Sequence, residues 1–385
     1  MKKLNYLLST SGKFHYFNIA KVLYRRNQLN KIVCGYPWVK LKIEKIPKNY
    51  IDNFSFYNIA NHFLHKQSYV NANKLIDNFD ILTKKKIDKL CSKHLDNTDI
   101  FISSTQNGVE TGKKIKEKNK IYICDQVSAN IFFENNLMDE EYKLFNQKRF
   151  FRDNWFADTA AQEYENSNLI SVPSNYVKST FDLKYQEKIF VNNFGINTNN
   201  FYPLHEKNKK KKFFDIVYIG SISIKKGIHY LIDAFNNFKH PYKRLHLIGS
   251  HVAVDVNFFK KKLNNEKIIV YGHVDNLKLN KILNECDVFA IATLTEGYAM
   301  VINQAAASGC PVIVTENSGA KEFVEENNCG FVVPIRDSKS ISDKFSTLSD
   351  DKDLLQKLSN NAVNASKDNS WENYCDRMEN LINAF

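Results

Sequence analysis

Strand-like and helix-like hydrophobic patterns alternate along this chain, and the alternation limits the folds open to it. Short apolar runs, such as 216–219 and 288–292, are each followed by a longer segment with helical periodicity. Strands that alternate with helices predict parallel β-sheets with helices on both faces. At 385 residues the chain is long enough for two such domains, each with its own hydrophobic core.

The sequence indicates a domain boundary near residue 200. A lysine-rich polar segment, residues 207–212, separates a stretch that ends at Pro203 from the predicted strand 215–219. The last residues of the chain form an amphipathic helix with Tyr374 and Met378 on one face. Such a helix needs a surface on which to bury that face.

Residues 288–314 carry the pattern of a ligand-binding turn. An apolar run ends before Glu296 and Gly297, and a helical pattern starts at Tyr298. Glycine lets a ligand approach the backbone, and the free N–H groups of the helix's first turn attract anions. Glu296 would repel phosphate, so we expect it to accept hydrogen bonds from sugar hydroxyls. A glutamate that only caps its helix would give the same pattern.

This stretch resembles a known family of enzymes. The run from Glu296 to Gln304, followed by Ala-Ser-Gly-Cys-Pro-Val-Ile, is similar to the E-x7-E region of retaining glycosyltransferase family 4. The resemblance implies the GT-B fold, an α/β architecture with two Rossmann-like doubly wound domains facing an interdomain cleft. The second acid of the family motif is Gln304 here, which accepts from a hydroxyl but carries no charge.

Residues 216–235 resemble the first strand, loop and helix of that family's donor domain. In the family, a basic residue before the glycine binds the donor diphosphate, and Lys226 before Gly227 matches it. Ser221 replaces the arginine that usually follows the first glycine, so Lys225 is a candidate for the second phosphate cation. A solvated lysine pair in front of a helix would have the same spacing.

Other segments resemble the family in the same order along the chain, including a hinge at 187–203 in which Asn197 replaces an Asp. The resemblance implies an acceptor-binding domain in residues 1–200 and a nucleotide-sugar-binding domain in 201–366. Residues 367–385, which begin near Trp371, would then form a helix that crosses back to the first domain. The donor-binding residues that it implies are Ser221, Lys225, His273, Val274, Gly297, Tyr298, Ala299, Met300 and Gln304.

The loops that follow predicted strands in the first domain should face the acceptor. Gly12 allows close approach, and Lys13 or His15 can touch phosphate or sugar, although His15 also fits a surface helix position. Asn107 lies in a polar loop suited to hydroxyl recognition. Asp125 stands where many relatives have a histidine. A carboxylate there would orient the acceptor hydroxyl or stabilise an oxocarbenium-like centre, unless it bonds only within its own loop.

The cysteine content indicates a reducing compartment. Its seven cysteines are scattered and odd in number, which favours free thiols over disulfides or a structural zinc site. The apolar part of residues 4–11 is too short for a signal peptide, and no run approaches the roughly 20 apolar residues of a membrane span. We therefore expect a cytoplasmic protein.

The excess positive charge is concentrated at one end of the chain. Residues 1–50 hold eleven Lys or Arg and a single acid, Glu44, out of a net charge of +12 for the whole chain. Aromatic residues are interleaved with these cations, a combination that suits the anionic inner face of a membrane. A lysine-rich coding bias would also give a basic surface. Nucleic acid would be attracted too, but no recognition motif accompanies the charge.

Rival motifs are absent or misplaced. No two glycines form G-x-G, so the dinucleotide fingerprint is missing. Residues 108–114 resemble a P-loop but are one residue short and lack its Ser or Thr. The D-x-D at Asp351 and Asp353 follows no strand. We expect no metal and no other cofactor.

The sequence thus predicts a retaining glycosyltransferase that moves a hexose-type sugar from a UDP- or GDP-sugar to a glycan or lipid-linked acceptor, in cell-surface polysaccharide or glycolipid synthesis. The predicted catalytic residues are Lys226, Glu296 and Asp125. A GT-B-like protein that binds a nucleotide sugar or glycan without turnover remains an alternative, as does a phosphorylase or epimerase on the same fold.

Overall fold

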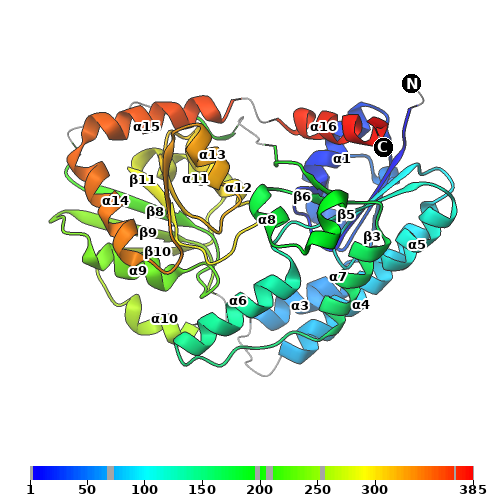
Figure 1. The fold of residues 1–385 in the computed structure, drawn as a ribbon, viewed down its shortest axis with the longest axis horizontal. Helices are drawn as coiled ribbons and strands as arrows, with labels where there is room; N and C mark the ends of the chain where they lie inside the picture. The colour runs from blue at the N-terminus through cyan, green and yellow to red at the C-terminus, as the bar shows by residue number, and fades with distance from the viewer. Residues whose placement is uncertain are drawn as a thin grey trace. The chain divides into compact units, whose positions relative to one another are not determined.

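Two β-sheets with only parallel strands form the framework of the structure (Figure 1). The computed structural model describes residues 3–66, 73–195, 200–204, 211–251, 256–367 and 370–384. In these residues the first sheet has seven strands in the order β3-β2-β1-β4-β5-β6-β7, and the second has six in the order β10-β9-β8-β11-β12-β13. The predicted α/β class with two doubly wound domains is confirmed.

The chain divides into two compact units. The first unit comprises Met1–Asn135, Lys148–Asn193 and Trp371–Phe385, and the second comprises Asn136–Gln147 and Phe194–Ser370. Hinge residue Asn197 and residues 207–210 of the predicted linker lie outside the described part of the chain.

The first unit covers its sheet with helices on both faces (Figure 1). α1 and α16 pack together on one face, while α4, α5 and α7 form a contiguous layer on the other. Its strands are β1 Tyr6–Thr10, β2 Leu29–Cys34, β3 Ile51–Asn53, β4 Ile100–Ser104, β5 Ile121–Asp125, β6 Leu169–Val172 and β7 Ile189–Val191. Its α-helices are α1 Tyr16–Arg25, α2 Trp38–Leu41, α3 Phe56–Lys66, α4 Asn73–Cys91, α5 Val109–Glu117, α7 Trp155–Asn166, α8 Asn175–Ser179 and α16 Trp371–Ala384. Its short 3₁₀ turns are η1 Lys42–Glu44, η2 Lys48–Tyr50, η4 Ser92–His94 and η5 Leu183–Lys188.

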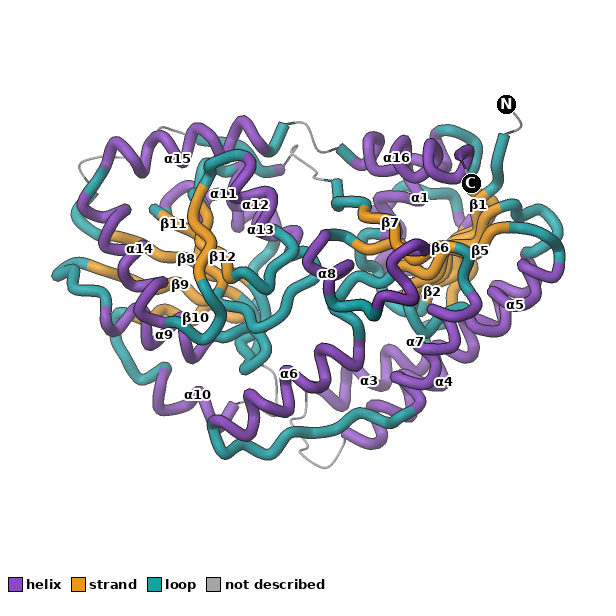
Figure 2. Tube along the Cα trace, in the orientation of Figure 1, coloured by secondary structure: helices purple, strands orange, loops and turns teal. Residues whose placement is uncertain are grey.

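The second unit has the same layered plan, with α9 and α14 packed together over its sheet (Figure 2). Its strands are β8 Phe214–Ile219, β9 Lys243–Ile248, β10 Ile268–Gly272, β11 Val288–Ile291, β12 Val312–Thr315 and β13 Gly330–Val333. Its helices are α9 Ile228–Asn237, α10 Val256–Lys262, α11 Asn276–Glu285, α12 Met300–Ala307, α13 Lys321–Glu326, α14 Ser338–Asp350 and α15 Lys352–Ala365.

Helix α6 (Ile131–Leu144) corrects the predicted domain boundaries, which assigned all of residues 1–200 to the first domain. Residues from Asn136 onward group with the second unit, because Met138 is buried in that unit's hydrophobic core. The fully buried carboxylate of Glu141 adds a polar anchor, accepting hydrogen bonds from His229 Nε2 at 2.8 Å and Arg336 Nε at 2.7 Å.

The P-loop-like run at 108–114 forms the start of α5, and carboxylates of the protein occupy its backbone donors. Both oxygens of Asp88 accept from the N–H groups of Glu110 and Thr111, at 2.8 and 2.9 Å. Glu163 accepts from the N–H of Gly108 at 2.7 Å. Side chains already satisfy the groups that would hold a phosphate, which agrees with the rejection of a P-loop.

Replacing Glu141 with Gln should lower the free energy of unfolding of the second unit by about 3 kcal/mol at pH 7, because a buried ion pair loses one partner. Burial alone would raise the pKa of the Glu141 carboxyl, but hydrogen bonds from His229 and Arg336 hold that pKa below its ordinary value of 4.5. The carboxylate's contribution is therefore present above pH 4.5 and is lost as the pH falls below it. The difference from the unmodified protein should shrink in acid.

Denaturant titrations at several pH values measure this difference. The matched control is Glu140→Gln, whose side chain is 64% exposed and lies 3.5 Å from the same arginine. We expect a change below about 0.5 kcal/mol for the control. Equal effects of the two substitutions would show that Glu141 is not an anchor.

Candidate functional site

The centre of the second sheet has the topology at which α/β proteins bind ligands. β8 and β11 are neighbours, yet β8 leads to β9 on one side and β11 leads to β12 on the other. Ligands bind beyond the carboxyl ends of strands at such a switch point. The two loops that start there contain most of the predicted donor-binding residues.

The structure brings together Lys226 and Glu296, which are 70 positions apart in the chain. The ammonium of Lys226 donates to Glu296 Oε2 in an ion pair, and both side chains are partly exposed. An ammonium has three donors and a carboxylate several acceptor positions, so each keeps capacity for a ligand. The geometry fits the predicted pairing of a diphosphate with the lysine and sugar hydroxyls with the glutamate.

The loops after β8 and β11 are joined backbone to backbone. The N–H of Leu294 donates to the carbonyl of Lys225 at 3.0 Å. Gly227 adopts a left-handed conformation, with φ of 63°, and a Cβ there would lie 1.7 Å from the carbonyl oxygen of Ala292. Only glycine permits this approach, and the approach places Lys226 beside the second loop.

A third loop, after β12, fixes the backbone of Glu296. The N–H of Glu296 donates to the carbonyl of Asn317 at 3.0 Å, and its carbonyl accepts from the N–H of Gly319 at 2.8 Å. Hydrogen bonds on both the N–H and the carbonyl of Glu296 therefore fix the backbone that carries the carboxylate. A side chain that must orient a ligand precisely needs such support.

Helix α12 begins at Met300, two residues later than the helical pattern predicts. Ala299 has an extended backbone, and Tyr298 is buried, with its hydroxyl donating to Asn303 Oδ1 at 2.9 Å. The ring of Tyr298 also packs edge-on against Phe194. Tyr298 can therefore meet a ligand only through its backbone.

The other predicted donor residues lie at the same edge of the sheet. Gln304 is partly exposed on α12, and its side chain makes no hydrogen bond to any residue that the structure describes. Ser221 directly follows Gly220 at the end of β8, and its carbonyl accepts from the hydroxyl of Tyr218 at 2.9 Å. His273 and Val274 follow the end of β10. Their roles, and that of Lys225, stay predictions.

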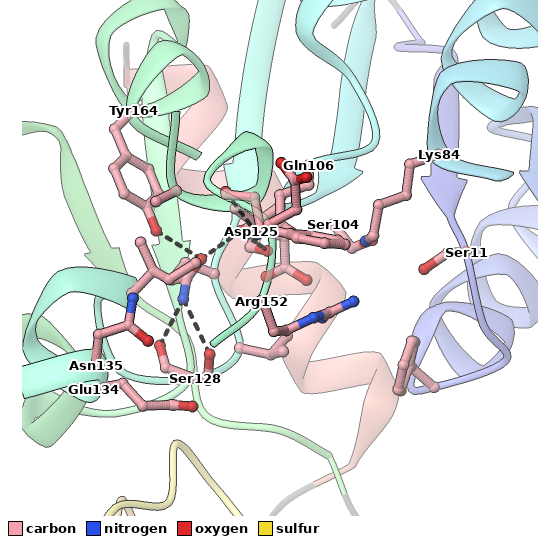
Figure 3. Close-up of a pocket in the computed structure, with 18 of the residues that line it drawn as sticks. Ser11, Lys84, Ser104, Gln106, Asp125, Ser128, Glu134, Asn135, Arg152 and Tyr164 are labelled. Carbon is pink, nitrogen blue, oxygen red and sulfur yellow. Dashed lines mark hydrogen bonds between the residues drawn. The ribbon is translucent and has the colours of Figure 1, made fainter. Parts of the chain in front are cut away.

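The first unit has a cavity of about 380 Å³ beyond the carboxyl ends of its strands (Figure 3). Two of the predicted residues, His15 and Asp125, line this cavity, together with the hydroxyl-bearing Ser11, Ser104 and Thr105. Its volume lies within the range of small-molecule sites. It is the candidate acceptor site.

Asp125 is buried in a hydrogen-bond network with side chains of other elements. Its Oδ2 lies 2.9 Å from His15 Nε2 and accepts from the hydroxyl of Tyr16, also at 2.9 Å. The ring of His15 stacks parallel to Trp371, the first residue of α16. Burial, and then the charge of Asp125, raise the pKa of Tyr16 well above its ordinary value, so the phenol stays a donor. The interpretation of His15 as a surface residue is wrong, as is a purely local role for Asp125.

Three predicted acceptor residues do not line the cavity. The ammonium of Lys13 is paired with the buried carboxylate of Glu44. Asn107 is fully buried, and its amide donates to Ser104 Oγ at 2.8 Å and to its own turn. At Gly12 a Cβ would lie 2.5 Å from the ring of Phe14, so a neighbouring side chain fills the space expected for a ligand.

Sequence reasoning missed the basic residues of this cavity. Lys84, Arg149 and Arg152 line it. Lys84 stands in a run of three lysines, a pattern that predicts a solvated surface. It nevertheless shares a helix face with the buried Ile87 and Cys91. The helical phase of α4 was thus the signal that could have identified it.

The described residues contain no group of three or more His, Cys, Asp or Glu side chains that could hold a metal ion. In the same residues, no helix combines the length and the apolar character that a membrane span requires.

The architecture is that of the GT-B glycosyltransferases. Sucrose-phosphate synthase from Thermosynechococcus elongatus superimposes with a TM-score of 0.74 over 100% of this chain and 99% of its own, at 15% identity. Anabaena HepE in complex with UDP and glucose superimposes with a TM-score of 0.70 over 100% of both chains, also at 15% identity. Identities this low establish the fold alone.

Sequence comparison finds a match to a known family within the second unit. The profile of the family described as glycosyl transferases group 1 matches residues 203–365 of this chain. The capsular polysaccharide biosynthesis glycosyltransferase CapM of Staphylococcus aureus is 28% identical over 222 residues, or 54% of this chain and 58% of CapM. The matches to the curated relatives span between 37% and 58% of those proteins' lengths.

Gly227→Ala should destabilise the second unit by about 2 kcal/mol or more, because a left-handed backbone and a clash with Ala292 combine. The matched control is Gly272→Ala. Gly272 is also left-handed, with φ of 69°, but no atom lies within 4 Å of the added Cβ. It should cost only about 1 kcal/mol. Denaturant unfolding of both variants measures the difference, and equal losses would disprove a tight contact between the loops.

Proposed function

We propose that the protein is a retaining glycosyltransferase of family 4 that transfers a hexose-type sugar from a UDP- or GDP-sugar. The observation that carries the proposal is the Lys226–Glu296 pair at the switch point of the second sheet. The group 1 family match over residues 203–365 supports it. HepE, which has the same fold, was crystallised with UDP and glucose, and this favours a UDP-sugar.

In this proposal the bound donor breaks the ion pair between Lys226 and Glu296 and contacts both side chains itself. The diphosphate binds the ammonium of Lys226 and the N-terminal backbone amides of α12. These groups stabilise the negative charge that builds on the leaving group. Glu296, released from the lysine, accepts hydrogen bonds from hydroxyls of the sugar. Gln304 can accept from a second hydroxyl, such as one of the ribose. No step in this scheme requires a metal ion.

The acceptor binds in the cavity of the first unit. Because Asp125 already accepts from Tyr16 and contacts His15, we propose that it positions His15 toward the acceptor. The resemblance to family 4 implies retention of configuration, with the leaving phosphate taking the acceptor proton. CapM acts in capsular polysaccharide biosynthesis, which supports a glycan or lipid-linked acceptor of cell-surface polysaccharide or glycolipid synthesis.

Two departures from the family motif favour a second candidate, a protein that binds a nucleotide sugar or glycan without turnover. Ser221 replaces an arginine and Gln304 replaces an acid. Incubation with a panel of UDP- and GDP-sugars separates the candidates. A transferase releases free nucleotide and forms a glycosylated product, whereas the second candidate binds and releases the intact donor.

We further propose that the first unit binds the cytoplasmic face of an anionic membrane. α2 and the following turn expose Val39 and Ile43, which are 77% and 74% accessible. The exposed cations Lys40 and Lys42 alternate with them. Apolar side chains that enter the interface beside cations that meet acidic head groups are the components of peripheral membrane binding.

Lys226→Ala should lower turnover by about 10²-fold or more, because the leaving diphosphate loses a preorganised cation. Nucleotide release from UDP- and GDP-sugars measures it. Lys278→Ala, which removes an exposed cation from α11 of the same unit, is the control and should leave turnover unchanged. A fully active Lys226→Ala variant would refute the proposed donor site.

The double substitution Val39→Glu and Ile43→Glu should abolish binding to vesicles that contain acidic phospholipid, because it removes the apolar contact and adds repulsion. Co-sedimentation with the vesicles measures binding, which should also weaken as salt rises. Leu183→Glu is the control, since Leu183 is 90% exposed elsewhere on the same unit. Equal binding by both variants would contradict a membrane surface at α2.

A further inference from the structure

The cavity of the first unit contains a buried lysine that pairs with none of the described residues. Lys84 projects from α4, and its side chain is only 9% exposed. Figure 3 shows it reaching into the cavity toward Ser104. Among the residues that the structure describes, none forms a hydrogen bond or an ion pair with its ammonium. A buried charge without a partner is costly, so such groups normally meet an opposite charge.

The acids near Lys84 are engaged elsewhere. Asp80 accepts from Arg152 at 2.7 Å and from Asn61 at 3.0 Å. Glu163 accepts from the backbone N–H groups of Gln106 and Gly108. Burial, opposed by Asp80, lowers the pKa of Lys84 to about 8, so the group is mainly charged at pH 7. Neither Asp80 nor Glu163 makes a direct contact with the ammonium of Lys84, and burial raises the pKa of Glu163 to about 8.

The rest of the cavity wall supplies what a sugar needs. Arg152 adds a second cation, although its Nε already donates to Asp77 at 3.0 Å. The side chains of Ser11 and Ser104 provide hydroxyls suited to the hydroxyls of a sugar ring. The cavity therefore combines hydroxyl recognition with a cation that none of the described residues contacts.

We propose that this cavity binds an acceptor sugar that carries a phosphate or carboxylate group, and that Lys84 contacts that anionic group. The inference rests on the proposed function, because it names the acceptor class of the same enzyme. An anion at Lys84 would form a charge-assisted hydrogen bond and remove the cost of the buried charge.

Calorimetric titration of the full chain tests this proposal, with UDP present in excess to fill the donor site. The probes are glucose 1-phosphate, glucuronic acid and the neutral methyl glucoside. The unmodified protein should bind at least one charged probe about tenfold more tightly than the neutral one. The preferred probe then identifies the anion as a phosphate or a carboxylate.

Three variants locate the effect. Lys84→Met should erase the preference for the charged probe, while Lys84→Arg should keep most of it. Lys89→Met, on the exposed side of the same helix, should bind as the unmodified protein does. The melting temperature of Lys84→Met should stay the same or rise, because the substitution removes a buried charge.

The proposal is overturned if Lys84→Met keeps the preference, if charged and neutral probes bind alike, or if no probe binds. A lower melting temperature of Lys84→Met with an unchanged preference would assign the lysine a structural role only. UDP binding and UDP-glucose hydrolysis in the same samples report on the second unit. They separate failure of this inference from failure of the proposed function.

Discussion

The candidate site of the second unit depends on one close backbone contact. Gly227, in a left-handed conformation, lies against the carbonyl oxygen of Ala292, and no other residue type fits there. The contact joins the loops after β8 and β11. These two strands are neighbours, but the strand that follows each one lies on the opposite side of the pair. Because the loops touch, a lysine and a glutamate from distant parts of the chain meet at one edge of the sheet. The chemistry proposed for this edge needs both charges within reach of one ligand.

Sequence reasoning located residues best where they follow the end of a predicted strand. Lys226 and Glu296 could be placed because each follows a recognisable strand and resembles a family motif. The partners of Asp125 could not, since His15 lies 110 positions away and only the folded sheet brings the two together. The second half of α6 was assigned to the wrong unit for a similar reason. Its partners, His229 and Arg336, lie far along the chain and give no local signal.

Two helix starts in the structure show why similar backbone geometry does not imply similar function. At α5, the carboxyl groups of Asp88 and Glu163 already accept from the first backbone N–H groups. At α12, the residue before the helix is Ala299, whose side chain cannot cap it. In the described residues no side chain caps α12, whereas the first backbone donors of α5 are used in folding. The sequence around a helix start cannot distinguish a start that is capped from one that is not, because the acids that cap α5, Asp88 and Glu163, come from α4 and α7.

The shared helix α6 has a consequence for how such proteins exchange parts during evolution. A single crossover near residue 200 would give a chimera a new second unit but keep the parental residues 136–147. Glu141 would then face whatever replaced His229 and Arg336, and Met138 would enter a core shaped for another side chain. Recombination that preserves folding must carry this short segment along with the distant unit that it belongs to. The second unit and the second half of α6 should therefore be inherited together, although they are separated in the gene.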